Sequence, residues 1–344
     1  LSALLFSVSA IAQTEVTAGV TRGKDYGVTY VLPKTEIELT VQATKHTYTP
    51  GEFCRYADRY LRLNNVSAEP EEFWTLDKIE TRIAGVPDKD NVYFVKMKDK
   101  TVAPLMELTE DGIVRSINIP FSGKPAAKTP EAKATESSID PRSFLTEEIL
   151  MSNSSAKMAE LTAREIYNIR DSKNIILRGQ AETMPKDGAS LQLVIDQLNK
   201  QEKALTQTFT GTTDRKDKVF TFLVEPDNNA QEQIAARFSA QLGVLPTNNL
   251  AGDPIYVSIR NTSTLPVPEE EGKKKKKIDG VIYNVPGKGN VTVSYQGKKL
   301  FNDEMSFTQF GHTEVLVDGL FDKKINTRVV FNSTTGGILK IDKD

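Results

Sequence analysis

Cysteine and histidine are scarce in this sequence. Among 344 residues there is one cysteine, Cys54, and there are two histidines, His46 and His312. A single thiol excludes an internal disulfide, so the fold must be held together by its core. These three side chains show no His-x-x-x-His spacing and do not form the ligand pattern of a zinc site. We therefore predict no bound metal and no cofactor.

Long apolar runs are also missing. No window approaches the roughly 20 apolar residues that a membrane-spanning helix needs. The nearest is the uncharged stretch 1–12, which ends in Ala10-Ile11-Ala12, a pattern that signal peptidases cut. We interpret residues 1–12 as part of a signal peptide, with a buried N-terminal strand as the alternative. The signal peptide predicts an exported protein without a membrane span, either soluble or held at a membrane by a partner.

An excess of charge of one sign is absent as well. The 44 Lys and Arg residues nearly balance 46 Asp and Glu residues, and the isoelectric point is about 6.0. This balance does not indicate nucleic acid or an anionic membrane surface as the main partner. A mean hydropathy of −0.38 is typical of a hydrated globular chain.

Residues 13–121 are predicted to form an N-terminal β-rich domain with one short helix. Apolar and polar residues alternate over 36–42, which is the pattern of a strand with one buried face. Apolar residues at helical spacing predict the helix over 53–63. Further strands are expected at 28–32 (ended by Pro33), 73–83, 92–95, 105–108 and 113–119, the last two forming a hairpin around Glu110-Asp111-Gly112.

The polar stretch 122–141 is interpreted as a linker or long loop. Two helices follow, over 155–178 with capping residues at 153–155 and over 189–209, and a turn at 184–188 joins them into a helical hairpin within 142–211. Residues 212–344 are predicted to form a C-terminal β-rich domain, because Pro and Gly separate short strands as in a sandwich or barrel. These strands are expected at 218–224, 255–259, 280–285, 291–295, 304–310, 313–317, 328–331 and 338–341.

Two short segments resemble each other. Gly27-Val28-Thr29-Tyr30-Val31-Leu32-Pro33 and Gly280-Val281-Ile282-Tyr283-Asn284-Val285-Pro286 share five or six similar positions, and each precedes another predicted strand. The similarity marks either the first strands of two related β units or the chance convergence of two segments that end at a proline.

The side chains with catalytic potential do not form a recognisable set. Neither histidine lies in the sequence pattern of a catalytic triad, and a Gly-x-Ser-x-Gly elbow is absent. His46 is expected in or at the end of a strand and His312 in a turn. Cys54 lies on the apolar-rich helix 53–63, where a small buried hydrophobe is favoured over a nucleophile. We predict no catalytic residue.

Four short motifs have a functional and a structural interpretation. Ser154-x-x-Lys157 matches an acylation motif, but the Lys-Thr-Gly strand that accompanies it is missing. Gly-rich 286–290 lacks the rest of a nucleotide-binding loop, and 88–91 begins like a calcium loop without its central Gly and closing Glu. The segment 269–277 consists of three Glu, Gly272 and five Lys. It either binds an anionic surface or forms a solvated loop tip. The structural interpretation is favoured for each.

Several stretches in order along the chain resemble a known family. They are Gly27–Pro33, Tyr48-x-Pro50-Gly51, Tyr56-Ala57-x-x-Tyr60-Leu61, Ala235–Ser239, Gly280–Val293, Gln309-Phe310-Gly311 and Thr335–Ile338. Together they are similar to domain of unknown function 4831, an uncharacterised family of exported Bacteroidetes proteins, over nearly the whole mature chain. The resemblance implies the periplasm or outer membrane of a Gram-negative bacterium. It supplies no catalytic residues, because the family has no assigned activity.

The sequence thus predicts a β-rich α+β fold, with two sandwich- or barrel-like units and a helical hairpin between them. The leading functional hypothesis is a non-enzymatic envelope protein that binds or assembles with a protein partner, for example by accepting a strand at a sheet edge. One alternative is an enzyme that acts on glycans through carboxylates alone, which needs an acid pair about 5–10 Å apart in a cleft. Another is a carrier of an apolar ligand, which needs a closed cavity of several hundred Å³.

Overall fold

The structure is a computed structural model that describes residues 15–18, 27–96, 106–122, 140–182, 187–227, 231–264, 280–317 and 327–343. Within these ranges the chain forms three antiparallel sheets and a group of helices. The prediction of a β-rich α+β fold is confirmed. Most of the predicted linker 122–141 lies outside the described residues.

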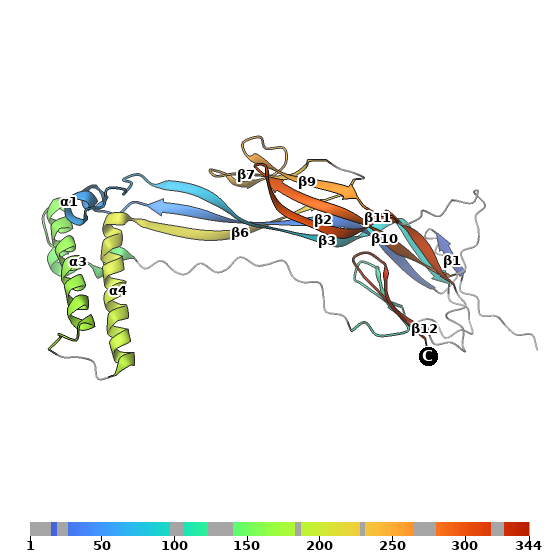
Figure 1. Cartoon of the computed structure of the whole chain (residues 1–344), viewed down its shortest axis with the longest axis horizontal. Helices are drawn as coiled ribbons and strands as arrows, with labels where there is room; N and C mark the ends of the chain where they lie inside the picture. The colour runs from blue at the N-terminus through green and yellow to red at the C-terminus, as the bar shows by residue number, and fades with distance from the viewer. Residues whose placement is uncertain are drawn as a thin grey trace, which may run out of the picture.

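The first sheet runs along the molecule (Figure 1). Its strand order is β1 (Glu15–Ala18), β3 (Glu71–Lys96), β2 (Gly27–Thr49) and β6 (Thr212–Val224). β2 has 23 residues and pairs with β3 on one side and, from Ile37 onward, with β6 on the other. At about 3.3 Å per residue, a strand of this length spans roughly 75 Å. The sheet therefore holds the helices well away from the C-terminal strands (Figure 1).

Two further sheets pack beside it. One has the order β11 (Lys298–Val317), β10 (Gly280–Tyr295), β9 (Asp253–Asn261), β7 (Gln233–Ser239) and β8 (Gly243–Leu245). The other has the order β13 (Ile338–Lys343), β12 (Thr327–Phe331), β5 (Val114–Ile117) and β4 (Met106–Leu108). The predicted hairpin between β4 and β5 is confirmed, and Gly112 in its turn has a φ of 83° that favours glycine.

Two apolar cores fill the space between the sheets. In the first, Leu39 and Val41 of β2 pack with residues such as Val257, Val293 and Phe307. In the second, Tyr30 and Val95 pack with residues of β5, β10 and β12, namely Val114, Ile117, Val281, Ile282 and Val329. Strands from before and after the helices therefore contribute to both cores.

The helices form an arm at one end of the long sheet (Figure 1). The helical arm comprises the 3₁₀ segments η1 (Cys54–Tyr56) and η2 (Pro141–Phe144) with α1 (Ala57–Leu61), α2 (Glu147–Leu150), α3 (Ser155–Leu177) and α4 (Gly188–Thr210). Ser154 and Asp187 cap α3 and α4, because each side chain accepts a hydrogen bond from a backbone N–H of the first turn. The two long helices match their predicted ranges, whereas part of the predicted turn 184–188 lies outside the described residues.

Prolines do not end the long strands, contrary to our prediction. β2 continues through Pro33 and β10 through Pro286, so the segments predicted as separate strands are merged. The pairing register shifts between Val31 and Pro33 and again between Val285 and Gly287. A bulge accommodates a residue that has no N–H to donate, and the ladder resumes beyond it. β3 and β11 likewise each merge two predicted strands.

The two similar segments meet in space. The Tyr30 hydroxyl accepts a hydrogen bond from the Ile282 N–H at 2.9 Å and lies 3.3 Å from the Ile282 carbonyl oxygen. Each segment opens a long strand with a glycine that lies against a carbonyl oxygen of the adjacent strand. A Cβ on Gly27 would lie 2.3 Å from the Val95 oxygen, and one on Gly280 would lie 2.0 Å from the Leu316 oxygen. The sequence similarity thus extends to local structure.

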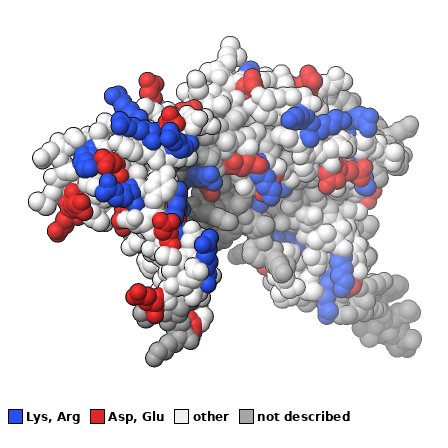
Figure 2. All heavy atoms as spheres, turned by 60° about the vertical axis from the view of Figure 1, so that its left-hand side comes forward, with Lys and Arg blue, Asp and Glu red and all other residues white. Residues whose placement is uncertain are grey.

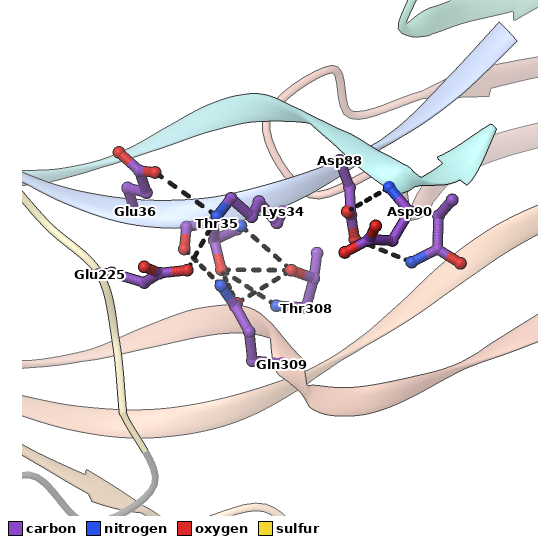
Figure 3. A network of polar contacts seen from close by, with 9 residues as sticks. Lys34, Thr35, Glu36, Asp88, Asp90, Glu225, Thr308 and Gln309 are labelled. Carbon is purple, nitrogen blue, oxygen red and sulfur yellow. Dashed lines mark hydrogen bonds and ion pairs between the residues drawn. The ribbon is translucent and has the colours of Figure 1, made fainter.

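One edge of β2 pairs with β6 only from Ile37 onward. Before that residue, the same edge is hydrogen-bonded to other elements (Figure 3). The Val31 N–H donates to the Gly112 oxygen at 3.0 Å, and the Pro33 oxygen accepts from Asn284 Nδ2 at 2.9 Å. Buried Thr35 is bonded through both its backbone and its side chain to Thr308 and Gln309 of β11, at 2.6–3.1 Å. These bonds satisfy backbone groups that an unpaired strand edge would expose.

Replacing Thr35 by Val tests this closure. Valine keeps the shape of threonine but leaves the Thr308 N–H without its partner, and the Gln309 Oε1 keeps only its bond from the Thr308 hydroxyl. We expect the free energy of unfolding to fall by about 1–3 kcal/mol, measured by urea denaturation at neutral pH. Thr292→Val is the matched control, because the Thr292 hydroxyl bonds to Asn302 at an exposed site and its loss should cost less than about 0.5 kcal/mol. Equal losses in the two variants would contradict the assignment.

Candidate ligand-binding groove

The two histidines lie far apart in the fold. His46 is in β2, where its ring stacks on Phe73 at 4.7 Å and its Nε2 lies 3.0 Å from the Thr75 hydroxyl. His312 lies in β11 rather than in the predicted turn, and its Nε2 is 3.0 Å from Glu314 Oε1. The turn was predicted because Gly311 precedes His312. In the structure, a Cβ on Gly311 would lie 1.9 Å from the Val285 oxygen, so this glycine allows two strands to approach closely.

The candidate nucleophiles Cys54 and Ser154 lie where their side chains have structural roles. Cys54 begins η1 and is partly buried beside the core of the helical arm. Ser154 is the N-cap of α3 and accepts from the Lys157 N–H at 3.3 Å, whereas the Lys157 Nζ bonds to Glu160 at 3.0 Å. The Ser-x-x-Lys motif is therefore a helix cap followed by an i,i+3 ion pair.

The loop-like motifs also lie in strands. Residues 286–290 belong to β10, and residues 88–91 belong to β3 rather than to a solvated turn. Asp88 accepts hydrogen bonds from the Asp90 N–H at 3.1 Å and from Asn91 Nδ2 at 2.8 Å (Figure 3). Nearby, Lys34 donates to Glu225 at 2.8 Å, and this bond raises the pKa of the Lys34 ammonium group. The Glu-Lys segment 269–277 lies outside the described residues.

In the part of the chain that the structure describes, no three His, Cys, Asp or Glu side chains gather closely enough to hold a metal ion. None of the described helices is both long and apolar enough to cross a membrane.

An open groove of about 810 Å³ contains both polar and apolar side chains. One wall is the β10–β11 hairpin and the other is the turn that leads into β13, with Ile83 of β3 between them. The volume falls within the roughly 300–1,000 Å³ that is usual for ligand sites. The hairpin contributes Tyr283, Pro286, Glu304, Met305, Ser306 and Glu314, the turn contributes Asn332, Thr334 and Thr335, and β13 contributes Ile338 and Leu339.

A chain of three polar side chains lies along the hairpin wall. The Tyr283 hydroxyl donates to Glu314 Oε2 at 2.7 Å, and His312 Nε2 lies 3.0 Å from Glu314 Oε1. The hydrogen bonds from Tyr283 and His312 lower the pKa of Glu314. Burial, together with the bond to Glu314, raises the pKa of Tyr283 to about 12. Glu314 is thus an ionised acceptor at neutral pH, and its side chain remains 49% exposed.

The second carboxylate of the groove is also held ionised. Lys288 Nζ donates to Glu304 Oε1 at 2.6 Å, and this bond lowers the pKa of Glu304. A glycosidase needs one carboxyl group with a raised pKa that can donate a proton. Glu304 and Glu314 both have the opposite shift.

Two other cavities lie elsewhere in the fold. A hollow of about 530 Å³ lies where the helical arm joins the sheet, and Tyr48 in it bonds to the Ser67 and Thr210 carbonyls. These bonds tie a loop to the end of α4, which is a structural role. A more enclosed apolar cavity near Leu32 and Val281 has only about 10 Å³. That volume is far below what an apolar ligand requires.

Sequence reasoning missed Tyr283 and Glu314 as a pair. Tyr283 was noticed only within the Gly280–Pro286 similarity, and Glu314 lies two residues after His312. The two face each other because β10 and β11 pair Tyr283 with Glu314 in register. The strand register would have identified the pair, but the bulge at Pro286 makes that register unpredictable from the spacing of the residues.

The tyrosine titration offers a direct test of the polar chain. The phenolate absorbance of wild type and of Tyr283→Phe, measured against pH, should differ by one group that titrates near pH 12. Glu314→Gln should lower this pKa only part of the way toward 10.0, because burial, the larger cause, persists. The stability that neutral Tyr283 contributes should be complete below pH 10.0 and be lost as the pH rises through about 12. If the pKa of Tyr283 is unchanged in Glu314→Gln, the contact between the two side chains is refuted. Glu72→Gln on β3 is the control, and it should leave the pKa of Tyr283 unchanged.

Comparison with known proteins places the chain in a family. No curated protein and no solved structure matches it. A family model described as a domain of unknown function, DUF4831, matches residues 26–339, and the chain therefore belongs to the DUF4831 family.

Proposed function

We propose that this protein is a non-enzymatic binding module of a bacterial cell envelope, and that its groove holds an extended segment of a partner protein with a basic side chain. The observation that carries the proposal is Glu314, which is ionised, half-exposed and fixed by Tyr283 and His312 in a groove of about 810 Å³.

The chemistry of the groove favours a cationic group on the ligand. Both carboxylates that line it have a lowered pKa. Glu304 already has the ammonium group of Lys288 as a partner. Glu314 is instead hydrogen-bonded to Tyr283 and His312, neither of which is Lys or Arg, and its side chain is 49% exposed. A Lys or Arg side chain would form a charge-assisted hydrogen bond with Glu314.

The shape of the groove favours an extended chain. It is open along its length and has apolar surface from Met305, Ile338 and Leu339 beside polar Asn332 and Thr334. This mixture of apolar contact and a few fixed polar groups is usual in specific binding sites. A peptide whose side chains alternate could place one basic group on Glu314 and its apolar neighbours on the groove walls.

The envelope location rests on the signal-like residues 1–12. A glycan-active enzyme has less support, because the lowered pKa values of Glu304 and Glu314 do not suit a general acid. A carrier of an apolar ligand also has less support, since the apolar cavity near Leu32 has only about 10 Å³.

Affinity purification of the tagged protein from native envelopes, followed by quantitative mass spectrometry, tests the proposal. Wild type should retain a partner in stoichiometric amount. Glu314→Lys should reduce its recovery at least roughly tenfold, because like charges replace an ion pair. Glu160→Gln is the matched control, since Glu160 is another carboxylate of lowered pKa but lies on α3.

The proposal fails if wild type is recovered alone. It also fails if Glu314→Lys, folded by circular dichroism, retains the partner as well as Glu160→Gln does. A partner that is lost only from the Glu314 variant places the binding surface at the groove.

A further inference from the structure

The outer half of the helical arm has no core of its own. The apolar core of the arm uses the inner half of its long helices, for example Ile166 of α3 and Leu205 of α4. Between residues 170 and 200, no described residue is buried. Ion pairs of Arg170 and Lys173 with Glu202 join the two helices at the limit of this core.

This outer half nevertheless carries a band of apolar side chains. Leu177 is 68% exposed and Leu193 is 62% exposed, and Ile175 and Val194 are exposed as well. We call these four residues, with Ile176, Leu191 and Ile195, the apolar band. Consecutive positions such as Ile175, Ile176 and Leu177 point in different directions around a helix, so α4 alone does not cover them.

The described residues beyond the band include charged ones. Arg178 and Glu182 follow α3, and Asp187 precedes α4. Insertion of the band into a membrane would carry these charged groups toward the hydrocarbon, at a cost of several kcal/mol. A band of this kind, set back from a charged tip, is suited to packing against other helices.

We propose that two copies of this chain associate through the apolar bands of their helical arms. A twofold axis would pack the end of α3 from one copy on the start of α4 from the other, and would repeat the contact in reverse. The four helices would then enclose the band as in a helix bundle.

The charges beside the band suit a second copy. Basic Arg178 adjoins Leu177 at the end of α3, whereas acidic Asp196 lies one turn from Leu193 on α4, where Gln192 Nε2 donates to it at 2.8 Å. A twofold contact between these helices brings each Arg178 toward Asp196 on α4 of the other copy. Figure 2 shows the arm with uncharged surface between separate acidic and basic groups. The inference is independent of the groove, which lies near the other end of the long sheet.

Sedimentation of the full chain over a range of concentrations measures the association. Wild type should form a dimer, and Leu177→Glu and Leu193→Glu should each raise the dissociation constant at least roughly tenfold. Leu250→Glu is the matched control, since Leu250 is 82% exposed in a turn distant from the arm. It should sediment like wild type.

Exchanging the charges of Arg178 and Asp196 distinguishes a specific contact from nonspecific hydrophobic association. Arg178→Asp alone and Asp196→Arg alone should each weaken the dimer, because each opposes like charges at both symmetry-related contacts. A mixture of the two variants should form heterodimers, in which both contacts again join opposite charges. This rescue requires folded protein and therefore excludes misfolding as the cause of the loss.

Three results would overturn the proposal. They are a wild-type chain that stays monomeric at every concentration, a dimer that Leu177→Glu and Leu193→Glu leave intact, and a mixture of the charge variants that shows no gain over either alone.

Discussion

The structure depends on the bonding of a single strand, β2. One edge of β2 pairs with β3, and the other is satisfied in succession by Gly112, Asn284, Thr308, Gln309 and finally β6. These partners come from four parts of the chain, because Thr308 and Gln309 are neighbours in β11. Because buried backbone groups must be hydrogen-bonded, these contacts fix the second and third sheets against the first. Loss of one contact would leave a polar group unpaired between sheets, where water cannot easily replace the lost bond.

The same strand connects the two surfaces that we propose for binding. Its beginning contributes Tyr30 and Leu32 to the core beside the groove, and its end reaches the helical arm. β2 has strand partners on both sides from Ile37 to Tyr48 and so resists bending there, which makes the distance between groove and arm depend on the length of β2. The paired arms of a dimer would thus present two grooves at defined positions, and such an arrangement could raise the apparent affinity for a partner with repeated basic segments.

Local patterns predicted much of this architecture. The ranges of α3 and α4 followed from apolar spacing and from Ser154 as a cap, and the β4–β5 hairpin followed from Gly112. β7 and β8 were missed, as was the short α2, because few alternating or periodic residues define them. Pro33 and Pro286 misled the prediction. A proline ends an ideal strand, but a bulge supported by neighbouring sheets lets the strand continue, and those neighbours lie far away in the sequence.

Composition and periodicity over a few residues were enough to predict the secondary-structure class and the helical hairpin, and a single cysteine excludes an internal disulfide. The sequence also showed that the Gly27–Pro33 and Gly280–Pro286 segments are similar, but it left open whether they open two related β units. Only the tertiary structure decided that Tyr283, His312 and Glu314 form one polar chain, and that Thr35 meets Thr308 across 273 residues. The physical reason is register: hydrogen bonding between distant strands decides which side chains face each other, and the shift at each bulge is set by packing rather than by local preference.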